Sequence, residues 1–411
     1  MKDLNKNKEG YKHTRAGWIP EQWNINTIGK VAEIKSGIGF KASEYIKNGV
    51  RLLQIENVGY GCVKWENPIM LPKDYLTKYP QLSLNENDIV LALNRPVTNG
   101  KLKIATLKKI DTPCILYQRV GKIEIVSEIV TSKYLFYLFK IVIKNHVQSQ
   151  SVGSDQPFIS LKYLYKEPIP IPSIEEQNCI SSILSTWDGE IETTENLISA
   201  KDQLKKGLMQ QLLTGKKRLP GFNGEWKKIG AGEVFKNISI KGNINEQLLS
   251  ATQDKGIIPR SMLEARVTMP SGELKSFKLV EPGDFVISLR SFQGGLEYSY
   301  YKGLVSPAYN VLKPKLKIDE EFYKYYFKSY DFIGHLSIAV IGIRDGKQIS
   351  YDDFSTVMIP YPDIIEQKAI SNILVTLDKE INLLKSQLEL FQQQKKGLMQ
   401  VLLTGAVRVK V

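Results

Sequence analysis

One stretch of the sequence has the residue types of a metal-dependent phosphodiester-cleaving site. Asp363 and Glu366-x-Lys368 combine two carboxylates with a lysine, but such sites hold the two parts on neighbouring strands with a wider gap between them. Here both parts fall at the predicted start of one helix. An internal repeat also replaces Asp363 by Ser173 and Lys368 by Asn178. The sequence therefore does not predict cleavage chemistry.

Other catalytic and metal-binding patterns are missing from the sequence. Thr214-Gly215-Lys216 lacks the upstream glycine of a phosphate-binding loop, and the glycine turn at 291–295 lacks the frame of a dinucleotide site. Asn67-Pro68-Ile69-Met70 lacks the second proline and the aromatic residue of an amino-methyltransferase motif. The three cysteines and three histidines are scattered without CxxC spacing, which predicts reduced thiols in the cytoplasm and no metal site. We expect a chain that is not an enzyme and holds no cofactor itself.

The chemistry that the sequence does offer is hydrogen bonding from loops. Polar side chains stand near glycines between apolar runs, where the backbone can approach a groove and the side chains can reach phosphates and base edges. In the first half the candidates are Lys35, Ser36, Lys41, Arg51, Gln54, Asn57, Asn94, Arg95, Lys101 and Lys103. In the second half they are Lys241, Thr252, Gln253, Arg260, Arg290, Ser291, Gln293, Arg344 and Lys347. Arg95 and Arg290, which each follow an apolar strand, are the leading candidates.

The charge is distributed unevenly along the chain. The net charge is +13, and residues 1–170 carry 25 Lys and Arg against 15 Asp and Glu, whereas residues 219–355 carry 18 against 16. A basic globular segment points first to nucleic acid. The nearly neutral second segment would instead recognise the shape and the base edges of nucleic acid through a few positioned side chains. No apolar run has the length of a membrane helix and the N-terminus has no signal-peptide core, so we expect no membrane partner.

An internal repeat must position these loops. Residues 169–219 and 359–409 align without a gap, 190 positions apart, with about half of the positions identical. Each copy opens on a proline-punctuated extended strip, continues as an apolar heptad seam and stops at Thr-Gly. The pattern predicts two helices of roughly 50 Å each. Each helix could lie on its own globular segment, but we expect the two to pair, with parallel and antiparallel orientations both open.

The two globular segments share several sequence landmarks, and the residues between these landmarks differ. Turn-plus-strand patterns recur at 87–93 and 283–289, and aromatic helix patterns recur at 134–146 and 322–335. The loops between these landmarks barely match. Two domains with similar scaffolds and different loops would recognise different targets. We predict an α+β chain with domains at 1–168 and 219–358 and long helical regions at 169–218 and 359–411.

The whole pattern resembles the specificity subunit (HsdS) family of type I restriction-modification systems. The resemblance covers essentially the whole chain and is most specific in the repeats, which carry EEQ and KKGLMQQLLTG in one copy and IEQ and KKGLMQVLLTG in the other. It implies two α/β target recognition domains, each reading one half of a bipartite, asymmetric duplex DNA site. It also implies long helices that pair as an antiparallel coiled coil, give the chain pseudo-twofold symmetry and set the spacing between the half-sites.

The resemblance further implies partner proteins. Two modification (methyltransferase) subunits would dock on the helices, restriction subunits would join the larger complex, and these partners would use S-adenosylmethionine, ATP and Mg²⁺. The repeated polar residues are the predicted docking set: Glu176, Gln177, Lys205, Lys206, Glu366, Gln367, Lys395 and Lys396. Capping of the helix start by the Glu-Gln pairs, and recent duplication of the Lys pairs, remain open as alternatives. An alternative for the whole chain is a basic scaffold that binds RNA or acidic protein without bipartite DNA specificity.

Overall fold

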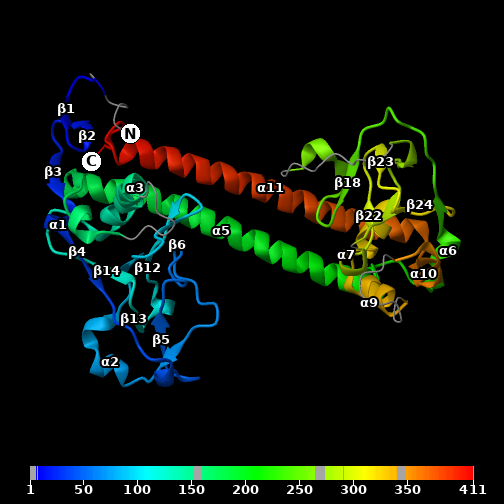
Figure 1. Cartoon of the computed structure of the whole chain (residues 1–411), viewed down its shortest axis with the longest axis horizontal. Coiled ribbons are helices and arrows are strands. Elements are labelled where there is room, and N and C mark those ends of the chain that lie inside the picture. The colour runs from blue at the N-terminus through cyan, green and yellow to red at the C-terminus, as the bar shows by residue number, and fades with distance from the viewer. Residues whose placement is uncertain are drawn as a thin grey trace. The chain divides into compact units, whose positions relative to one another are not determined.

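The computed structural model describes residues 6, 8–150, 159–263, 274–289, 291–339 and 349–410. The chain forms two compact units. Unit 1 comprises Met1–Thr193 together with Glu389–Val411, and unit 2 comprises Thr194–Leu388. Each unit therefore combines one globular segment with parts of both long helices (Figure 1).

The two repeats form helices of 39 residues each, α5 (Ile174–Leu212) and α11 (Ile364–Leu402). Local chemistry fixes their ends. At the start of α5 the Ser173 hydroxyl accepts a hydrogen bond from the Glu176 backbone N–H at 3.2 Å, as an N-cap does. Beyond their ends Gly215 and Gly405 both have φ +70°, the left-handed conformation in which glycine stops a helix.

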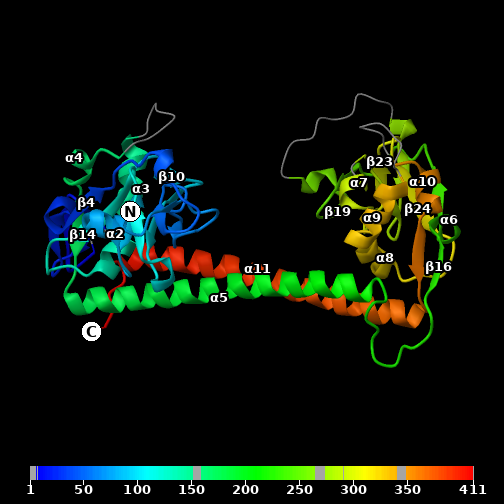
Figure 2. The ribbon, with the colours of Figure 1, turned by 90° about the horizontal axis from the view of Figure 1, so that it is seen from below.

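The two helices run antiparallel, and each unit shows this independently (Figures 1 and 2). In unit 1, Trp187 from the first part of α5 packs edge-on against Phe391 from the last part of α11, with ring centroids 5.6 Å apart. In unit 2, Lys201 from the later part of α5 forms an ion pair of 2.6 Å with Glu380 from the first part of α11. The structure therefore confirms the predicted antiparallel pair.

Unit 1 contains two larger sheets, three two-stranded sheets (β1-β2, β10-β11 and β15-β3) and the helix α3. The larger sheet has five strands in the order β4-β14-β9-β12-β6, and the smaller has four in the order β7-β5-β13-β8. The elements are β1 Tyr11–Thr14, β2 Gly17–Pro20, β3 Asn24–Thr27, α1 Ile28–Val31, β4 Ala32–Ser36, β5 Val50–Leu53, β6 Tyr60–Gly61, β7 Met70–Leu71, α2 Tyr75–Lys78, β8 Ser83–Leu84, β9 Ile89–Ala92, β10 Val97–Thr98, β11 Lys101–Leu102, β12 Ile104–Thr106, β13 Cys114–Leu116, β14 Val120–Ile125, α3 Ser132–Gln150, α4 Leu161–Leu164 and β15 Pro168–Ile171.

The core of unit 1 joins the five-stranded sheet to the long helices. Tyr134 and Phe139 of α3 are fully buried in one cluster with Leu184 of α5 and Leu402 of α11. The four-stranded sheet has a separate core that includes Leu52 and Ile115. The aromatic helix pattern at 134–146 therefore anchors the sheet to the helix pair.

Unit 2 repeats this plan with a smaller sheet. Four strands lie in the order β17-β24-β21-β22, with two-stranded pairs β18-β19, β20-β23 and β16-β25 beside them. The elements are β16 Lys227–Gly230, α6 Ala231–Val234, β17 Phe235–Ile238, β18 Leu249–Thr252, β19 Gly256–Pro259, β20 Lys278–Val280, β21 Phe285–Ile287, α7 Ser291–Gly294, β22 Glu297–Tyr298, β23 Gly303–Val305, β24 Asn310–Pro314, α8 Glu320–Tyr326, α9 Tyr330–Ala339, α10 Tyr351–Thr356 and β25 Met358–Tyr361.

The core of unit 2 is built on aromatic rings. Phe285 meets Phe235 at 5.5 Å and Phe327 at 5.1 Å between centroids, both edge-to-face, which is the favoured geometry for such pairs. The helix predicted over 322–335 is two helices, α8 and α9, because the chain turns between Phe327 and Tyr330. Within the described ranges no helix is both long and apolar enough to cross a membrane.

Candidate nucleic-acid interface

The predicted DNA-contacting residues of unit 1 gather at one end of its five-stranded sheet. Strands β4 and β9 finish there, while β14 and β12, which run antiparallel to β9, begin there. Strand β6 runs parallel to β12 and also begins there, with Tyr60 beside Ile104. We call this place, where the connections at residues 36–38, 94–103 and 117–119 and the start of β6 meet, the loop end of unit 1. Because the sheet fixes all of these strands, their terminal side chains are held on a rigid frame.

Arg95 is an exposed cation of this loop end that follows a buried strand. Strand β9 is entirely buried, whereas Arg95, three residues beyond it, is exposed and has φ +46°. A positive φ is uncommon for a bulky residue, and Pro96 restricts its backbone further. Asn94 beside it is half-buried. The sequence placed Arg95 correctly at the end of an apolar strand, and the structure gives it a fixed and strained backbone.

A tight hairpin projects from the same loop end. Strands β10 and β11 are joined by Asn99 (φ +51°) and Gly100 (φ +68°), the Asn-Gly pair typical of a two-residue hairpin turn. Lys101 lies over the ring of Tyr60 at 5.9 Å, and the Tyr60 hydroxyl is 2.6 Å from the Thr98 hydroxyl. The hairpin thus presents a cation and an exposed aromatic ring together.

Several other candidates of unit 1 serve the fold. Arg51 lies over the ring of Trp65 at 4.5 Å and donates to the Ile110 carbonyl at 2.5 Å. Asn57 is buried and bonds the backbone of its own loop, and the Lys103 ammonium donates to the Ile55 carbonyl at 2.9 Å. Arg51 sits on β5, in the other sheet, so the structure does not bring it to the loop end.

The remaining unit 1 candidates differ in their exposure and in whether they have a partner within the chain. Lys35 forms an ion pair with Glu124 at 2.5 Å, whose hydrogen bond and charge raise the pKa of Lys35. Ser36 and Lys41 are exposed, and Gln54 is half-buried in the connection that leads to β6. Ser36 closes β4 at the loop end, so it joins Arg95 there.

Two side chains at the loop end were missed by sequence reasoning. Gln118 and Arg119 occupy the turn that leads into β14, and both are exposed. They follow a short buried strand and precede Gly121, but neither was among the residues predicted to contact DNA. Strand pairing alone brings them beside the end of β9, and no local sequence pattern reports that pairing.

Unit 2 has a loop end of the same construction. Strand β21 ends at Ile287 opposite Asn310, the first residue of β24, and β22 begins beside them. Gln253, Gln293 and Lys241 are exposed on the connections, whereas Ser291 is buried and accepts a hydrogen bond from the Ser288 backbone at 2.9 Å. The Thr252 hydroxyl closes its own turn on the Gly256 carbonyl. The predicted candidates Arg290, Arg344 and Lys347 lie outside the described residues.

Lys328 fastens two of these connections. Its ammonium donates to the Gly294 carbonyl at 2.9 Å and the Gln253 carbonyl at 3.3 Å, and it pairs with the buried Glu297 at 2.7 Å. Burial raises the pKa of Glu297 even though Lys328 opposes the shift. Arg260 is half-buried, and its Nε and one Nη are buried without a hydrogen-bond partner in the part of the chain that the structure describes.

The Glu-Gln pairs of the repeats are buried at the base of each unit. Arg408 places two guanidinium nitrogens on Glu176 at 2.6 and 2.9 Å, and the Trp23 indole donates to the same carboxylate at 3.0 Å. Unit 2 repeats this arrangement with Arg218, Trp226 and Glu366, at 2.6, 2.7 and 2.8 Å. Both glutamates are at most 2 % exposed.

The neighbouring glutamines cap the junction between helix and domain. Gln177 accepts from the Thr131 backbone at 2.8 Å and donates to the Ile129 and Pro172 carbonyls. Gln367 accepts from the Asp319 backbone at 2.8 Å and donates to the Pro362 carbonyl. Each glutamine thereby ties the start of its helix to the segment that precedes α3 or α8.

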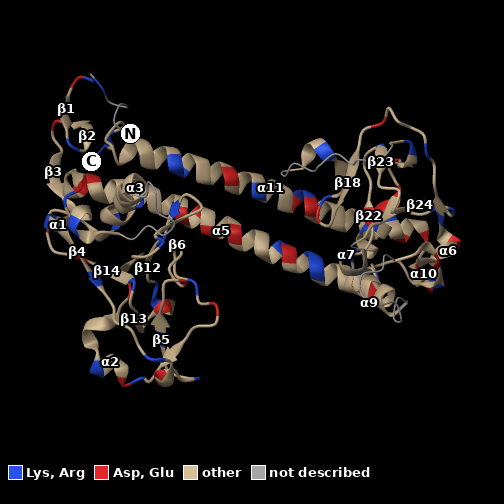
Figure 3. Cartoon of the chain, viewed as in Figure 1, with Lys and Arg blue, Asp and Glu red and all other residues tan. Residues whose placement is uncertain are grey.

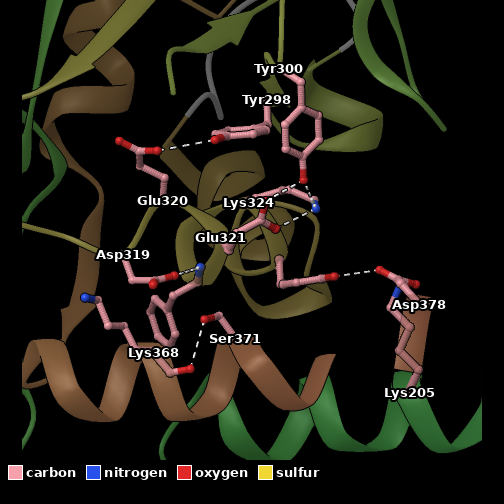
Figure 4. Close-up of polar contacts among 12 residues, drawn as sticks. Lys205, Tyr298, Tyr300, Asp319, Glu320, Glu321, Lys324, Lys368, Ser371 and Asp378 are labelled. Atoms are coloured by element: carbon pink, nitrogen blue, oxygen red, sulfur yellow. Dashed lines mark hydrogen bonds and ion pairs between the residues drawn. The ribbon is translucent and has the colours of Figure 1, made fainter. Parts of the chain in front are cut away.

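The first lysine of each repeated pair also lies inside its unit. Lys395 of α11 pairs with Asp188 of α5, whose carboxylate also accepts from the Tyr137 hydroxyl at 2.7 Å. Although burial alone would raise the pKa of Asp188, the nearby Lys140 and Lys395 ammonium groups hold it below its usual value. In unit 2, Lys205 reaches Asp378 at 2.5 Å (Figure 4).

That second network continues through α8. The Tyr325 hydroxyl donates to Asp378 at 2.6 Å, and the Lys205 ammonium lies 5.2 Å from the centre of the Tyr325 ring. Burial and the Asp378 carboxylate raise the pKa of Tyr325. The two networks therefore join both long helices to a helix of the adjoining domain by the same Lys-Asp-Tyr chemistry.

The second lysine of each pair, Lys206 and Lys396, is exposed. Both long helices carry acidic as well as basic residues (Figure 3). The charged residues of α5 from Glu175 to Glu195 are all acidic and its lysines follow near its end, so neither long helix forms a continuous basic stripe. Of the eight predicted docking residues, six are thus committed to contacts inside the chain, and Lys206 and Lys396 alone are exposed. Within the described residues no group of three or more His, Cys, Asp or Glu side chains is arranged to hold a metal ion.

Comparison with protein-family models gives one family. The model described as "Type I restriction modification DNA specificity domain" matches residues 20–200 and again residues 223–390. The two matches cover most of unit 1 and of unit 2, and together they cover well over half of the chain.

Two curated relatives come from Methanocaldococcus jannaschii. The type I restriction enzyme MjaVIII specificity subunit is 44% identical over 216 residues, which are 52% of this chain and 51% of that protein. The chain thus spans about half the length of this relative. The putative type I restriction enzyme MjaX specificity subunit is 26% identical over an alignment that covers 98% of each chain.

Solved structures share the fold. The type I restriction-modification S subunit from M. genitalium matches with a TM-score of 0.59 at 15% identity, over 98% of this chain and 99% of that chain. A chain of a type I restriction-modification complex matches with a TM-score of 0.54 at 17% identity, over 95% and 99%.

Proposed function

The chain belongs to the family of type I restriction-modification DNA specificity subunits, and on that premise we propose that each unit reads one half of a bipartite, asymmetric duplex DNA site. One observation carries this proposal. The two units have the same sheet frame with different side chains at its loop end. A shared frame places two reading surfaces in the same way on two DNA segments, while different side chains read different bases.

The frame can be matched strand by strand. In unit 1, β14 begins with Val120 opposite Ala92 of β9, and in unit 2, β24 begins with Asn310 opposite Ile287 of β21. Three residues beyond β9 stands Arg95, and three residues beyond β21 the sequence has Arg290. The side chains around them differ between the units, which favours an asymmetric site over a palindromic one.

The helices would set the distance between the half-sites and carry the partners. We propose that two methyltransferase subunits dock on α5 and α11, through surfaces that include Lys206 and Lys396. In unit 2, Lys206 lines an open groove of about 740 Å³ together with Met209, Gln210 and Tyr330. Tyr330 is 74 % exposed, and tyrosine and methionine are enriched at surfaces that bind another protein.

The chemistry of modification and cleavage belongs in this proposal to the partners. S-adenosylmethionine, ATP and Mg²⁺ would be held by the methyltransferase and restriction subunits, and this chain would select the DNA. Cations without internal partners at the loop end of unit 1 would contact phosphates and bases of duplex DNA, as the basic balance of the first segment favours.

Sequencing of methylated adenines tests the proposal directly. DNA from cells that co-express this chain with its cognate methyltransferase subunit should carry modification at one two-part motif with a fixed gap. Cells that express the methyltransferase subunit without this chain serve as the control. Absence of chain-dependent modification, with the methyltransferase active and bound, would favour the alternative of a basic scaffold for RNA or protein.

A further inference from the structure

We propose that Arg119 reads a guanine-containing base pair next to the one contacted by Arg95, within the half-site of unit 1. This inference rests on the proposed DNA-reading function of unit 1. It assigns a specificity-determining role to a residue that was not among those predicted from the sequence to contact DNA.

Strand pairing places Arg119 beside the end of β9. The Leu93 backbone N–H donates to the Arg119 carbonyl at 2.8 Å, so Arg119 lies directly across from Leu93. Arg95 lies two residues beyond Leu93, in the segment that continues from β9. Neighbouring strands are about 4.8 Å apart. Both arginines are exposed, and neither side chain has a hydrogen bond or an ion pair in the described part of the chain.

The backbone at Arg119 is unfavourable for an arginine. Arg119 is the third residue of a turn closed by the Val120 N–H on the Tyr117 carbonyl at 3.3 Å, and its φ is +66°. Glycine or asparagine is favoured at this position of a turn with positive φ. The exposed side chain has no hydrogen bond or ion pair among the described residues that would offset the strain. Strain without structural benefit is typical of residues retained for binding.

The chemistry of the loop end suits guanine. An arginine fork donates two parallel hydrogen bonds to O6 and N7 of guanine, the commonest base-specific contact in the major groove. The stretches 93–103 and 117–121 contain no Asp or Glu, so no acid of these stretches neutralises the two arginines. Two forks on adjacent strand ends can therefore address neighbouring base pairs.

Unit 2 lacks the second arginine. Val120 and Asn310 are the first residues of equivalent strands, so the position of Arg119 corresponds to that of Tyr309. The Tyr309 carbonyl accepts from the Lys278 ammonium at 2.5 Å, and its side chain has no guanidinium to offer. The second reading group thus distinguishes the half-site of unit 1 from that of unit 2.

The test uses the full chain with its methyltransferase partner and reads the methylated motif. Arg119→Gly removes the fork and suits the positive φ, so its unfolding temperature should equal or exceed that of the unaltered chain. Discrimination at one G·C position of one half-site should fall about tenfold or more, while the other half-site and the gap stay unchanged. Arg15→Ala removes one exposed charge from the β1–β2 turn of the same unit and should leave the motif intact.

The outcomes separate this inference from the function on which it rests. A folded Arg119→Gly variant with the unaltered motif at every position would overturn the role of Arg119 and leave the proposed function standing. Lack of any two-part motif with the unaltered chain would instead overturn the proposed function. If Arg119→Gly abolishes modification entirely, the methylated motif is read again with Arg119→Lys, which keeps the charge and removes the fork. Weakened discrimination at a single G·C position then supports fork reading, and an unchanged motif contradicts it.

Discussion

Arg408, near the end of the chain, holds both carboxylate oxygens of Glu176 at 2.6 and 2.9 Å, although 232 residues separate them. Glu176 is 2 % exposed, so its charge depends on this partner and on the Trp23 indole for compensation. A buried carboxylate that loses its cation is left with an uncompensated charge, which is far more costly than the pair itself is stabilising.

We therefore expect Arg408→Met to destabilise unit 1 by about 2–4 kcal/mol, less than for a fully buried pair because the arginine is partly exposed. Arg218→Met should have a similar effect in unit 2, where Arg218 holds Glu366 in the same way. Thermal unfolding would measure both effects. Arg15→Met is the matched control on an exposed arginine, and an equally large loss for that variant would contradict the assignment.

Charge reversal should have different effects at the two lysines of each repeated pair. Lys206→Glu with Lys396→Glu should leave the unfolding temperature nearly unchanged and weaken co-purification of the methyltransferase subunit, because both side chains are exposed. Lys205→Glu with Lys395→Glu should lower stability by about 2 kcal/mol or more, because each glutamate would face Asp378 or Asp188. Normal co-purification with the exposed pair reversed would argue against docking at those positions.

Lys140 predicts a pH dependence in unit 1. Burial, with repulsion from Lys395, lowers its pKa from 10.5 to about 8, while Asp188 opposes the shift. Between pH 8 and 10.5 the unfolded chain binds a proton that the folded chain has released, so this group makes stability rise with pH in that window. Below pH 8 both states are charged and the full cost of the buried ammonium remains.

Lys140→Met should accordingly stabilise unit 1 at pH 7 by about 1–3 kcal/mol, and the gain should shrink as the pH approaches 10.5. The side chain already lies against the ring of Phe136, 4.3 Å from the ammonium, so an apolar replacement suits the site. Unfolding temperatures across pH 7–10.5 would measure the effect. The exposed Lys133, on the same helix, provides the control: Lys133→Met should show no pH-dependent difference, and parallel curves for Lys140→Met would refute the expectation.

Arg95→Ala should weaken DNA binding by about 1–3 kcal/mol and relax one base position of one half-site. Arg95 is exposed, has no internal ion pair among the described residues and follows a rigid buried strand. A binding assay at fixed salt, with one base pair of the half-site varied at a time, would measure both effects. Unchanged affinity and sequence preference would remove Arg95 from the reading surface.

The helices and the family could be predicted because their signals are local. The heptad seam and the closing Thr-Gly are read from neighbouring residues, and the ungapped repeat from comparing the sequence with itself. The predicted fold class and family are confirmed. The roles of Glu176 and Lys395 could not be read in this way, because their partners Arg408, Tyr137 and Asp188 come from distant segments. One signal was present: Arg218 and Arg408 stand at the same place in the two repeats, as Glu176 and Glu366 do.

The reading surface is harder to predict because it depends on strand register. Arg119 stands beside the end of β9 only after β14 has paired with it. The predicted DNA contacts themselves stay predictions, including those of Arg290, Arg344 and Lys347. The domain boundaries at 168, 218 and 358 also stay predictions, although each unit combines one globular segment with parts of both helices.

The residue ranges of the two units determine the order in which they can be completed during synthesis. Unit 2 is continuous from Thr194 to Leu388, whereas unit 1 needs Glu389–Val411 to supply Phe391, Lys395 and Arg408. Because a ribosome emits the chain from its N-terminus, the domain that is begun first is finished last. The first domain must wait, with Glu176 lacking Arg408 and Asp188 lacking Lys395, until the last part of α11 and the residues that follow it emerge.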